Sequence, residues 1–199
     1  MRSLKKLCWT AVAALALFVA VGGGTASATT LEVGGVSQNK SVSMEMTLKS
    51  GTSMLLKDEF GTTTETCTSS TMAGSTSSPF TVTSITLVLA VVRTEKCTHT
   101  DTVLALGILH FHWFSGTNAS VSMSGSETTI QSTFFGASAI CKTGTGTTIG
   151  TLTGTKEGNA TLDVNATINC GILGSSSWTG TYTVTKVNGV AGAGLGAVN

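Results

Sequence analysis

Two histidines, His110 and His112, lie two residues apart within an apolar segment of the 199-residue chain. On a β-strand both imidazole rings would project from one face, a spacing that can hold two corners of a metal site. His99 is a third candidate ligand, and Asp101 or Glu127 would have to complete the set. No motif places these acidic residues beside the histidines. The simpler interpretation is a half-exposed polar strand face that binds no metal.

The sequence contains no recognised catalytic motif. None of its serines lies in the Gly-x-Ser-x-Gly turn that presents a nucleophile, and the run Met123–Ser126 departs from this pattern. The ten acidic residues are scattered, so no carboxylate pair is selected for glycoside cleavage. The glycine-rich segment Gly144–Gly154 lacks the Gly-Lys-Ser/Thr of a phosphate-binding loop and predicts a hairpin. We therefore expect neither an enzyme nor a cofactor.

Aromatic side chains provide the other candidate ligand face. Trp178 and Tyr182 are four residues apart, so they would share one face of a continuous strand. Exposed rings of this kind could stack on sugars, as in a carbohydrate-binding module, whereas rings turned inward would pack in a core. Of these two interpretations, burial in the core is favoured.

The first 28 residues have the layout of a secretory signal peptide. Three positive charges precede the apolar run Leu7–Val21, and small residues lead up to a cleavage site before Thr29. The run is too short for a transmembrane helix, which needs roughly 20 apolar residues. Cys8 precedes the apolar run instead of following it, so a lipoprotein anchor is disfavoured. We expect a secreted protein.

The charge that remains after cleavage argues against several partners. Removing Arg2, Lys5 and Lys6 leaves eight basic residues against ten acidic ones, a formal net charge of −2. The basic residues are scattered, whereas nucleic-acid binding needs them clustered. The most apolar later stretch, Ile85–Val92, is too short to span a membrane. We expect no nucleic-acid partner and no membrane span.

Four cysteines, an even number in an exported chain, predict two disulfides. Of the three possible pairings, we favour Cys67 with Cys97 and Cys141 with Cys170, because each loop of about 30 residues can consist of one or two hairpins whose ends meet. Zinc binding is disfavoured because the cysteines are far apart and form no Cys-x-x-Cys pair.

Alternating apolar and polar residues, with glycine turns between them, predict an all-β fold. The segment Thr102–Phe114 is long enough for a helix, but its alternating end favours a strand. The small-residue run Ser69–Pro79 is expected to be a loop and Arg93–Cys97 a polar corner. About ten strands would form an antiparallel β-sandwich or flattened barrel over residues 29–189, and residues 190–199 are expected to be a flexible Gly/Ala tail. The expected strands are 41–49, 54–57, 62–68, 80–92, 102–114, 120–124, 127–132, 137–142, 160–169 and 177–185.

Several Gly/Thr-rich segments around the last two cysteines, Cys141–Thr147, Gly150–Gly154, Gly158–Thr161 and Asn169–Gly171, carry a resemblance to known sequences. Together they resemble uncharacterised secreted proteins of actinobacteria, a group with no known active site. The strand around Cys67 and the Gly-Thr-Leu-Thr-Gly stretch are also similar to secreted proteins described as activators of alkane oxidation. That resemblance implies an extracellular accessory role.

These observations predict a secreted, non-enzymatic domain that binds an extracellular ligand or a surface polymer, or self-associates through Thr-rich strand edges. One alternative is a carbohydrate-binding module that uses exposed aromatic rings. A second alternative is a secreted metal-binding protein or hydrolase.

Overall fold

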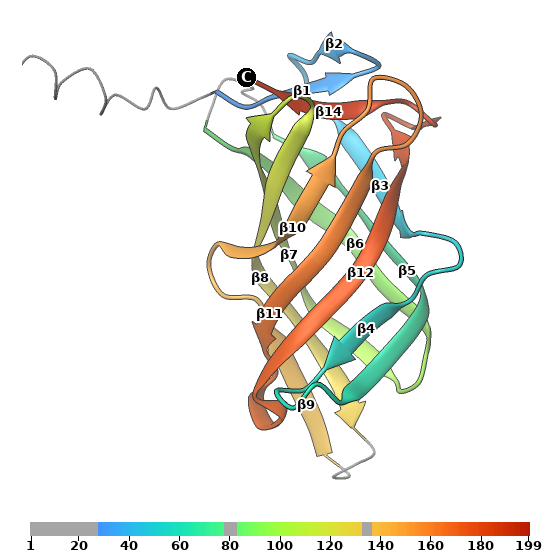
Figure 1. The fold of residues 1–199 in the computed structure, drawn as a ribbon, viewed down its shortest axis with the longest axis vertical. Helices are drawn as coiled ribbons and strands as arrows, with labels where there is room; N and C mark the ends of the chain where they lie inside the picture. The colour runs from blue at the N-terminus through green and yellow to red at the C-terminus, as the bar shows by residue number, and fades with distance from the viewer. Residues whose placement is uncertain (1–27, 78–82, 133–136) are drawn as a thin grey trace, which may run out of the picture.

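The computed structural model describes residues 28–77, 83–132 and 137–199 (Figure 1). The predicted signal peptide, residues 1–28, lies outside this part of the chain except for its last residue. Among the described residues the one helical element is the single 3₁₀ turn η1 (Gly171–Leu173), and antiparallel strands dominate. The predicted all-β fold is therefore confirmed. No helix in the described ranges has the length and apolar character needed to cross a bilayer.

The main sheet closes on itself, which corresponds to the barrel alternative of the two predicted architectures. Its circuit runs β3–β5–β6–β7–β8–β10–β11–β12 and returns to β3. At one end β4 takes the place of β3 between β5 and β12, and β9 takes the place of β10 beside β8. The strands are β3 (Ser43–Leu48), β4 (Met54–Lys57), β5 (Thr63–Thr76), β6 (Ile85–Cys97), β7 (Asp101–Ser115), β8 (Asn118–Ser132), β9 (Ala137–Lys142), β10 (Thr147–Thr153), β11 (Thr161–Asn169), β12 (Ser175–Val187) and the short β13 (Val190–Ala191).

Alternating burial explains why these segments are strands. In β11, Leu162, Val164 and Ala166 point inward while the residues between them are exposed or half-buried. In β7, Leu109 and Phe111 are fully buried, as the alternating end of that segment predicted. The expectation of a strand in place of a helix for this segment is confirmed.

Two segments predicted as irregular are strand. The expected loop Ser69–Pro79 is part of β5 as far as Thr76, and the expected corner Arg93–Cys97 is the end of β6. These two stretches pair with each other, so β5 continues across small polar residues because it has a partner along its length. Pairing between distant segments overrides the local preference of Ser, Thr and Gly for turns.

A small second sheet covers the end of the closed sheet that carries β3 and β10 (Figure 1). It consists of β1 (Thr30–Val33), β2 (Val36–Ser37) and β14 (Leu195–Val198), with Thr30 opposite Val198. The prediction of a flexible tail over 190–199 is therefore wrong. Leu195 and Ala197 are fully buried, and the glycines of this segment allow its backbone to pack closely against neighbouring chain.

Gly154 is one position where such close approach is required. A Cβ there would lie 2.1 Å from the carbonyl oxygen of Thr117 and 2.7 Å from the Cα of Gly196 in β14. We expect Gly154→Ala to lower the free energy of unfolding by about 1–3 kcal/mol through overpacking, measured by urea denaturation. Gly144→Ala is the matched control: its Cβ would meet only the Thr147 hydroxyl, at 3.5 Å, so a change within about 0.5 kcal/mol is expected. Equal losses in both variants would contradict this account.

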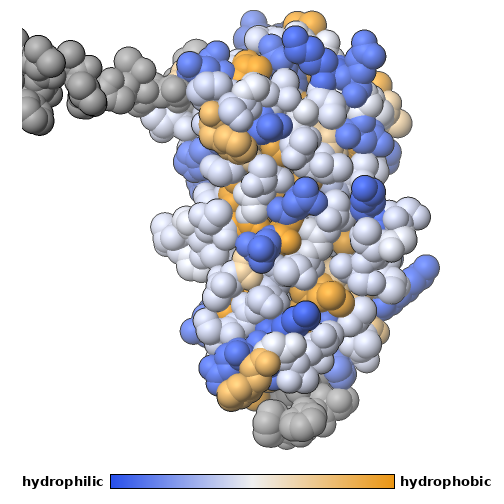
Figure 2. Space-filling model, in the orientation of Figure 1, coloured by the Kyte–Doolittle hydropathy of each residue, from blue (hydrophilic) through white to orange (hydrophobic). Residues whose placement is uncertain are grey.

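The interior contains two hydrophobic clusters. The larger one fills the end of the closed sheet nearest the small sheet, and the smaller one comprises Leu56, Ile130, Ala139, Cys141, Cys170 and Leu173. Ile168 and Trp178 pack against both clusters. On the outer face formed by β10, β11 and β12, hydrophobic groups form only small, separated patches among weakly polar and hydrophilic ones (Figure 2). The large hydrophobic clusters of these strands therefore lie inside the closed sheet and not on this outer face.

Candidate functional site: a cavity inside the closed sheet

A cavity of about 80 Å³ lies between the two hydrophobic clusters, because residues of both line it. Strands β4 to β9, β11 and β12 all contribute to its wall. The lining is mainly apolar and includes Met54, Leu56, Met72, Met123, Ile130 and Ile168. A mostly apolar cavity with a few polar groups is the usual form of a small-molecule site.

Asp101, the first residue of β7, contributes one polar group to this cavity. It pairs across the sheet with Ile130, a buried residue that also lines the cavity. Its Oδ1 is buried and has no hydrogen-bond partner among the described residues. Its Oδ2 lies 3.5 Å from the Sγ of Cys67, but a disulfide sulfur has no proton to donate.

Burial and, to a smaller extent, the neighbouring carboxylate of Glu65 together raise the pKa of Asp101 from 3.8 to about 6. A hydrogen bond from Thr94 and the charge of His99 act in the opposite direction. The carboxyl group therefore changes its charge near pH 6 while it faces an apolar cavity.

Trp178 contributes the second unpaired polar group. Its Nε1 is buried without a hydrogen-bond partner in the described part of the chain, and its ring lines the cavity. Tyr182 is 1% exposed, and its hydroxyl donates a hydrogen bond to the Oγ of Ser70 at 3.1 Å. Burial raises the pKa of Tyr182 to about 12, an effect opposed by the hydrogen bond with Ser70. The tyrosine is thus satisfied within the protein, whereas the tryptophan is not.

Trp178 and Tyr182 do share one face of β12, as their spacing predicted, but that face points into the closed sheet. The favoured interpretation, burial in the core, is therefore confirmed for Tyr182, whose ring is inaccessible from outside because the sheet closes around it, while Trp178 is half-buried. The alternative of an exposed platform that uses both rings is wrong.

The backbone pairing of the strands beside Asp101 is incomplete. β6 and β7 form ladder pairs only from Ile85–Phe111 to Val88–Ile108, although they are consecutive strands. Gly107, which immediately precedes Ile108 in β7, has a φ of +77°. This left-handed conformation redirects the strand at the point where its pairing with β6 stops. The cavity residues Val92, Thr94 and Asp101 belong to the stretches beyond this point. The cavity therefore lies behind two strand edges that do not pair with each other.

Glu65 forms a buried hydrogen-bonded cluster next to the cavity. Its side chain is fully buried, and its Oε1 accepts hydrogen bonds from the backbone N–H of Thr66, Thr98 and His99 at 3.0, 2.8 and 3.2 Å. The Thr98 hydroxyl also donates to Oε1, at 2.5 Å, and His99 Nδ1 lies 2.9 Å from Oε2. This carboxylate fixes the loop that connects β6 to β7.

Glu65 was not among the site residues predicted from the sequence. Its spacing from Cys67 could have identified it. Residues two apart in a strand share one face, so a cysteine that is buried predicts that Glu65 is buried on the same inward face.

The structure does not assemble the proposed metal ligands. His110 and His112 lie on the outer face of β7, because Leu109 and Phe111 occupy the inner face, and His110 Nδ1 is 3.3 Å from the Thr86 hydroxyl. His99 is near the opposite end of this strand. Asp101 and His110 are nine positions apart, which corresponds to about 30 Å of extended chain. The fifth candidate, Glu127, forms an ion pair with Lys142 at 2.9 Å. The four residues of the predicted ligand face are thus divided between the interior (Trp178, Tyr182) and the outer surface (His110, His112).

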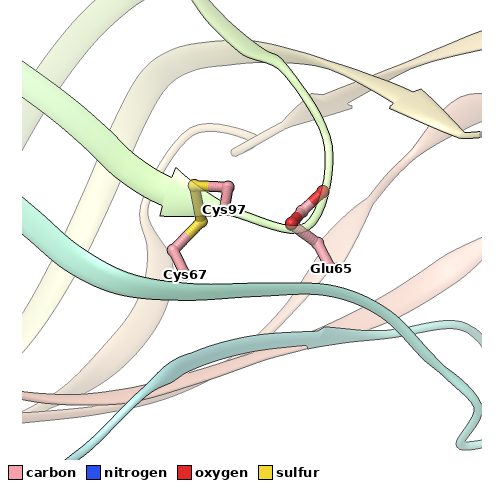
Figure 3. Close-up of side chains that lie close together, drawn as sticks. All are labelled: Glu65, Cys67 and Cys97. Atoms are coloured by element: carbon pink, nitrogen blue, oxygen red, sulfur yellow. A yellow bond between two sulfur atoms is a disulfide. The ribbon is translucent and has the colours of Figure 1, made fainter.

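Within the described ranges, one group of three potential metal ligands has its donor atoms close together: Glu65, Cys67 and Cys97 (Figure 3). The two sulfurs are joined in a disulfide, so neither is a thiolate able to bind a metal. Glu65 belongs to the hydrogen-bonded cluster, and the three residues do not form a metal centre.

Both predicted disulfides are confirmed. Cys67 and Cys97 are cross-strand partners in β5 and β6. Cys141 of β9 is joined to Cys170, which directly follows β11. β9 and β11 share a single ladder pair, Asn169–Lys142, so the second disulfide closes the sheet where hydrogen bonding is minimal.

The raised pKa of Asp101 leads to a prediction about stability. Between pH 4 and pH 6 the folded protein holds a proton that the unfolded chain has lost, so this residue makes the fold less stable as pH rises through that window. Asp101→Asn removes the ionisation. Its stabilising effect relative to wild type should be small at pH 4, grow up to pH 6 and level off above it, reaching on the order of 1 kcal/mol. Urea denaturation across this pH range checks the prediction, and a difference that is constant with pH would contradict it.

Comparison with family models, with curated proteins and with solved structures finds no match for this chain. Function must therefore be argued from the site itself. The features that bear on function are the apolar cavity, its two unpaired polar atoms and the incomplete β6–β7 pairing beside Asp101.

Proposed function

We propose that the protein is a secreted, non-enzymatic binding protein that holds a small, largely apolar molecule inside its closed sheet. The observation that carries the proposal is the pair of buried polar atoms, Asp101 Oδ1 and Trp178 Nε1, that lack hydrogen-bond partners among the described residues of an apolar cavity. More than nine-tenths of buried polar groups in proteins are paired, and each unpaired one costs about 1–3 kcal/mol. A molecule that pairs with these atoms would recover that free energy.

The architecture supports this proposal. A closed antiparallel sheet of about this size has an interior that can hold one small ligand in addition to packed side chains. Three of the lining residues, Met54, Met72 and Met123, have flexible side chains that can adapt to the shape of a bound molecule. The two disulfides fit an oxidising, extracellular compartment, in which an extracellular ligand would be met. The size of the cavity limits that ligand to a molecule small enough to fit inside the closed sheet.

Tryptophan fluorescence tests the proposal. In a Trp113→Phe variant of the secreted protein, Trp178 is the remaining tryptophan after removal of the signal peptide, and its ring lines the cavity. Titration with n-pentane or 1-butanol should produce a saturable change in its emission. The same titration of a variant that also carries Met123→Phe, which fills the cavity, should show no saturable change.

A matched variant with Val88→Phe, on the outer surface of β6, should bind like the parent. Circular dichroism establishes that each variant is folded. The proposal is wrong if the parent shows no saturable change, or if the folded, cavity-filled variant binds as well as the parent.

A further inference from the structure

We infer that the cavity selects a small neutral alcohol, whose hydroxyl donates a hydrogen bond to Asp101 Oδ1 and accepts one from Trp178 Nε1. This inference rests on the proposed function, because it names the class of molecule that the same cavity would hold. It depends on what the two unpaired atoms need: ionised Asp101 is an acceptor only, and the indole N–H of Trp178 is a donor only.

A hydrocarbon fits the apolar lining but pairs with neither atom. It would leave Asp101 Oδ1 and Trp178 Nε1 unpaired and still more isolated from water. A hydroxyl has one donor and two acceptor lone pairs, so a single small group can satisfy both requirements.

The charges around the cavity argue against ions. Two carboxylates, Asp101 and Glu65, lie on the same side, and Glu65 raises the pKa of Asp101 by charge repulsion, so a carboxylate ligand would meet like charge. Lys142 also lines the cavity, but its ammonium group is paired with Glu127. An anion therefore has no free cation in this lining to bind.

An alkylammonium ion would be attracted to Asp101 but satisfies only half of the site. It has donors and no acceptor, so the N–H of Trp178 would remain unpaired. Glu65 offers little further attraction, since both of its oxygens already accept hydrogen bonds from the loop around Thr98 and His99. Burying an ammonium group in an apolar cavity carries a much larger desolvation cost than burying a hydroxyl.

The protonation state of Asp101 should change this selectivity. Its pKa is about 6; below that value the carboxyl group can donate, and two donors then point at the ligand. A ketone, with two lone pairs and no donor, fits that arrangement better than an alcohol does. The ionisable groups around Asp101 are Glu65 of β5 and His99 of the β6–β7 loop, and Lys142 of β9 and Tyr182 of β12 also line the cavity.

Ligand-detected NMR titrations of the secreted protein at pH 8 and pH 5 test the inference. The probes are 1-butanol, 2-butanone, butylammonium, butyrate and n-pentane, which have similar size. At pH 8 we expect 1-butanol to bind roughly tenfold to a hundredfold more tightly than n-pentane, the factor expected when unpaired groups gain partners. Butyrate should bind most weakly of the five probes. The affinity of 2-butanone relative to that of 1-butanol should be higher at pH 5 than at pH 8.

Two pairs of variants separate specific pairing from general effects. Asp101→Asn should abolish the pH dependence of the alcohol-to-ketone ratio, whereas Asp163→Asn, at an exposed position of β11, should retain it. Trp178→Phe should reduce the preference for 1-butanol over n-pentane. Trp113→Phe should not, because the Nε1 of Trp113 already donates to the carbonyl oxygen of Gly116.

The outcomes distinguish the two proposals. If n-pentane or butylammonium binds as tightly as 1-butanol at pH 8, the alcohol inference is wrong and the cavity remains a small-molecule site. If the alcohol-to-ketone ratio is the same in wild type and Asp101→Asn at both pH values, the assigned role of Asp101 is wrong. If none of the five probes binds at either pH, the proposed function fails together with the inference.

Discussion

Replacing Glu65 by alanine is expected to lower the free energy of unfolding by about 3–5 kcal/mol, the range for removing one partner from a buried charged network. The carboxylate accepts hydrogen bonds from the backbone N–H groups of Thr66, Thr98 and His99 and contacts the imidazole of His99. Alanine would remove this acceptor from a fully buried position, and the N–H groups of Thr66 and Thr98 would keep only the bonds that they also make to the Thr98 hydroxyl and the Thr66 carbonyl oxygen. The β6–β7 loop would then lose the group that holds it against β5.

Urea denaturation at pH 7 measures this effect. Glu65→Gln keeps the size of the side chain and one acceptor oxygen, so its loss should be intermediate. Glu95→Ala provides the matched control, because Glu95 is exposed on the neighbouring strand and its side chain accepts one hydrogen bond among the described residues, from the Ser69 hydroxyl at 3.5 Å. Its expected effect is within about 0.5 kcal/mol. If Glu65→Ala costs no more than Glu95→Ala, the cluster does not stabilise the fold.

The second large effect is expected from the disulfide between Cys141 and Cys170. Replacing both residues by alanine should lower the free energy of unfolding by about 3–4 kcal/mol on the chain-entropy model, because the closed loop has a sequence separation of 29. A local effect should accompany this loss. β9 and β11 share only the Asn169–Lys142 ladder pair, so few other interactions hold them together at this end of the sheet.

Hydrogen exchange of the backbone amides distinguishes the local effect from the global one. In the Cys141→Ala/Cys170→Ala variant, residues 165–169 of β11 and residues 139–142 of β9 should exchange faster than the drop in global stability explains. In the control variant Cys67→Ala/Cys97→Ala, a similar loss of stability is expected with no selective change in β9. That disulfide joins the terminal pair of the long β5–β6 ladder, far from β9 in the strand order. Equal protection of β9 in the two variants would contradict the role assigned to Cys141–Cys170.

Local patterns in the sequence predicted much of the fold. Strict alternation located the strand at 160–169, and glycine turns located those at 54–57 and 137–142. The even number of cysteines and their spacing led to the observed disulfides. The continuation of β5 through Thr76 was missed, because the stabilising partner of its Ser- and Gly-rich half is β6, which local propensity does not reveal.

The candidate site was predictable only in part. The spacing of Trp178 and Tyr182 predicted that they share one face of β12, and burial of that face was the favoured interpretation, which holds for Tyr182. That this face also lines a cavity was not predictable, because the other lining residues come from different strands. Asp101 was considered only as a metal ligand. Its place at the cavity depends on β7 separating from β6 beyond Gly107, which is a property of the whole sheet.

The pairing of β1 with β14 has a consequence for how the protein folds. Thr30 lies opposite Val198, so the small sheet joins residues from the two ends of the described chain. The closing pairs of the main sheet, between β3 and β12, are also far apart in sequence. Such a topology has a high contact order, which slows folding because loop-closure entropy is lost before the contacts form. During synthesis the chain can complete neither sheet until its last strands have emerged, so it remains unfolded for longer than a protein built from local hairpins alone.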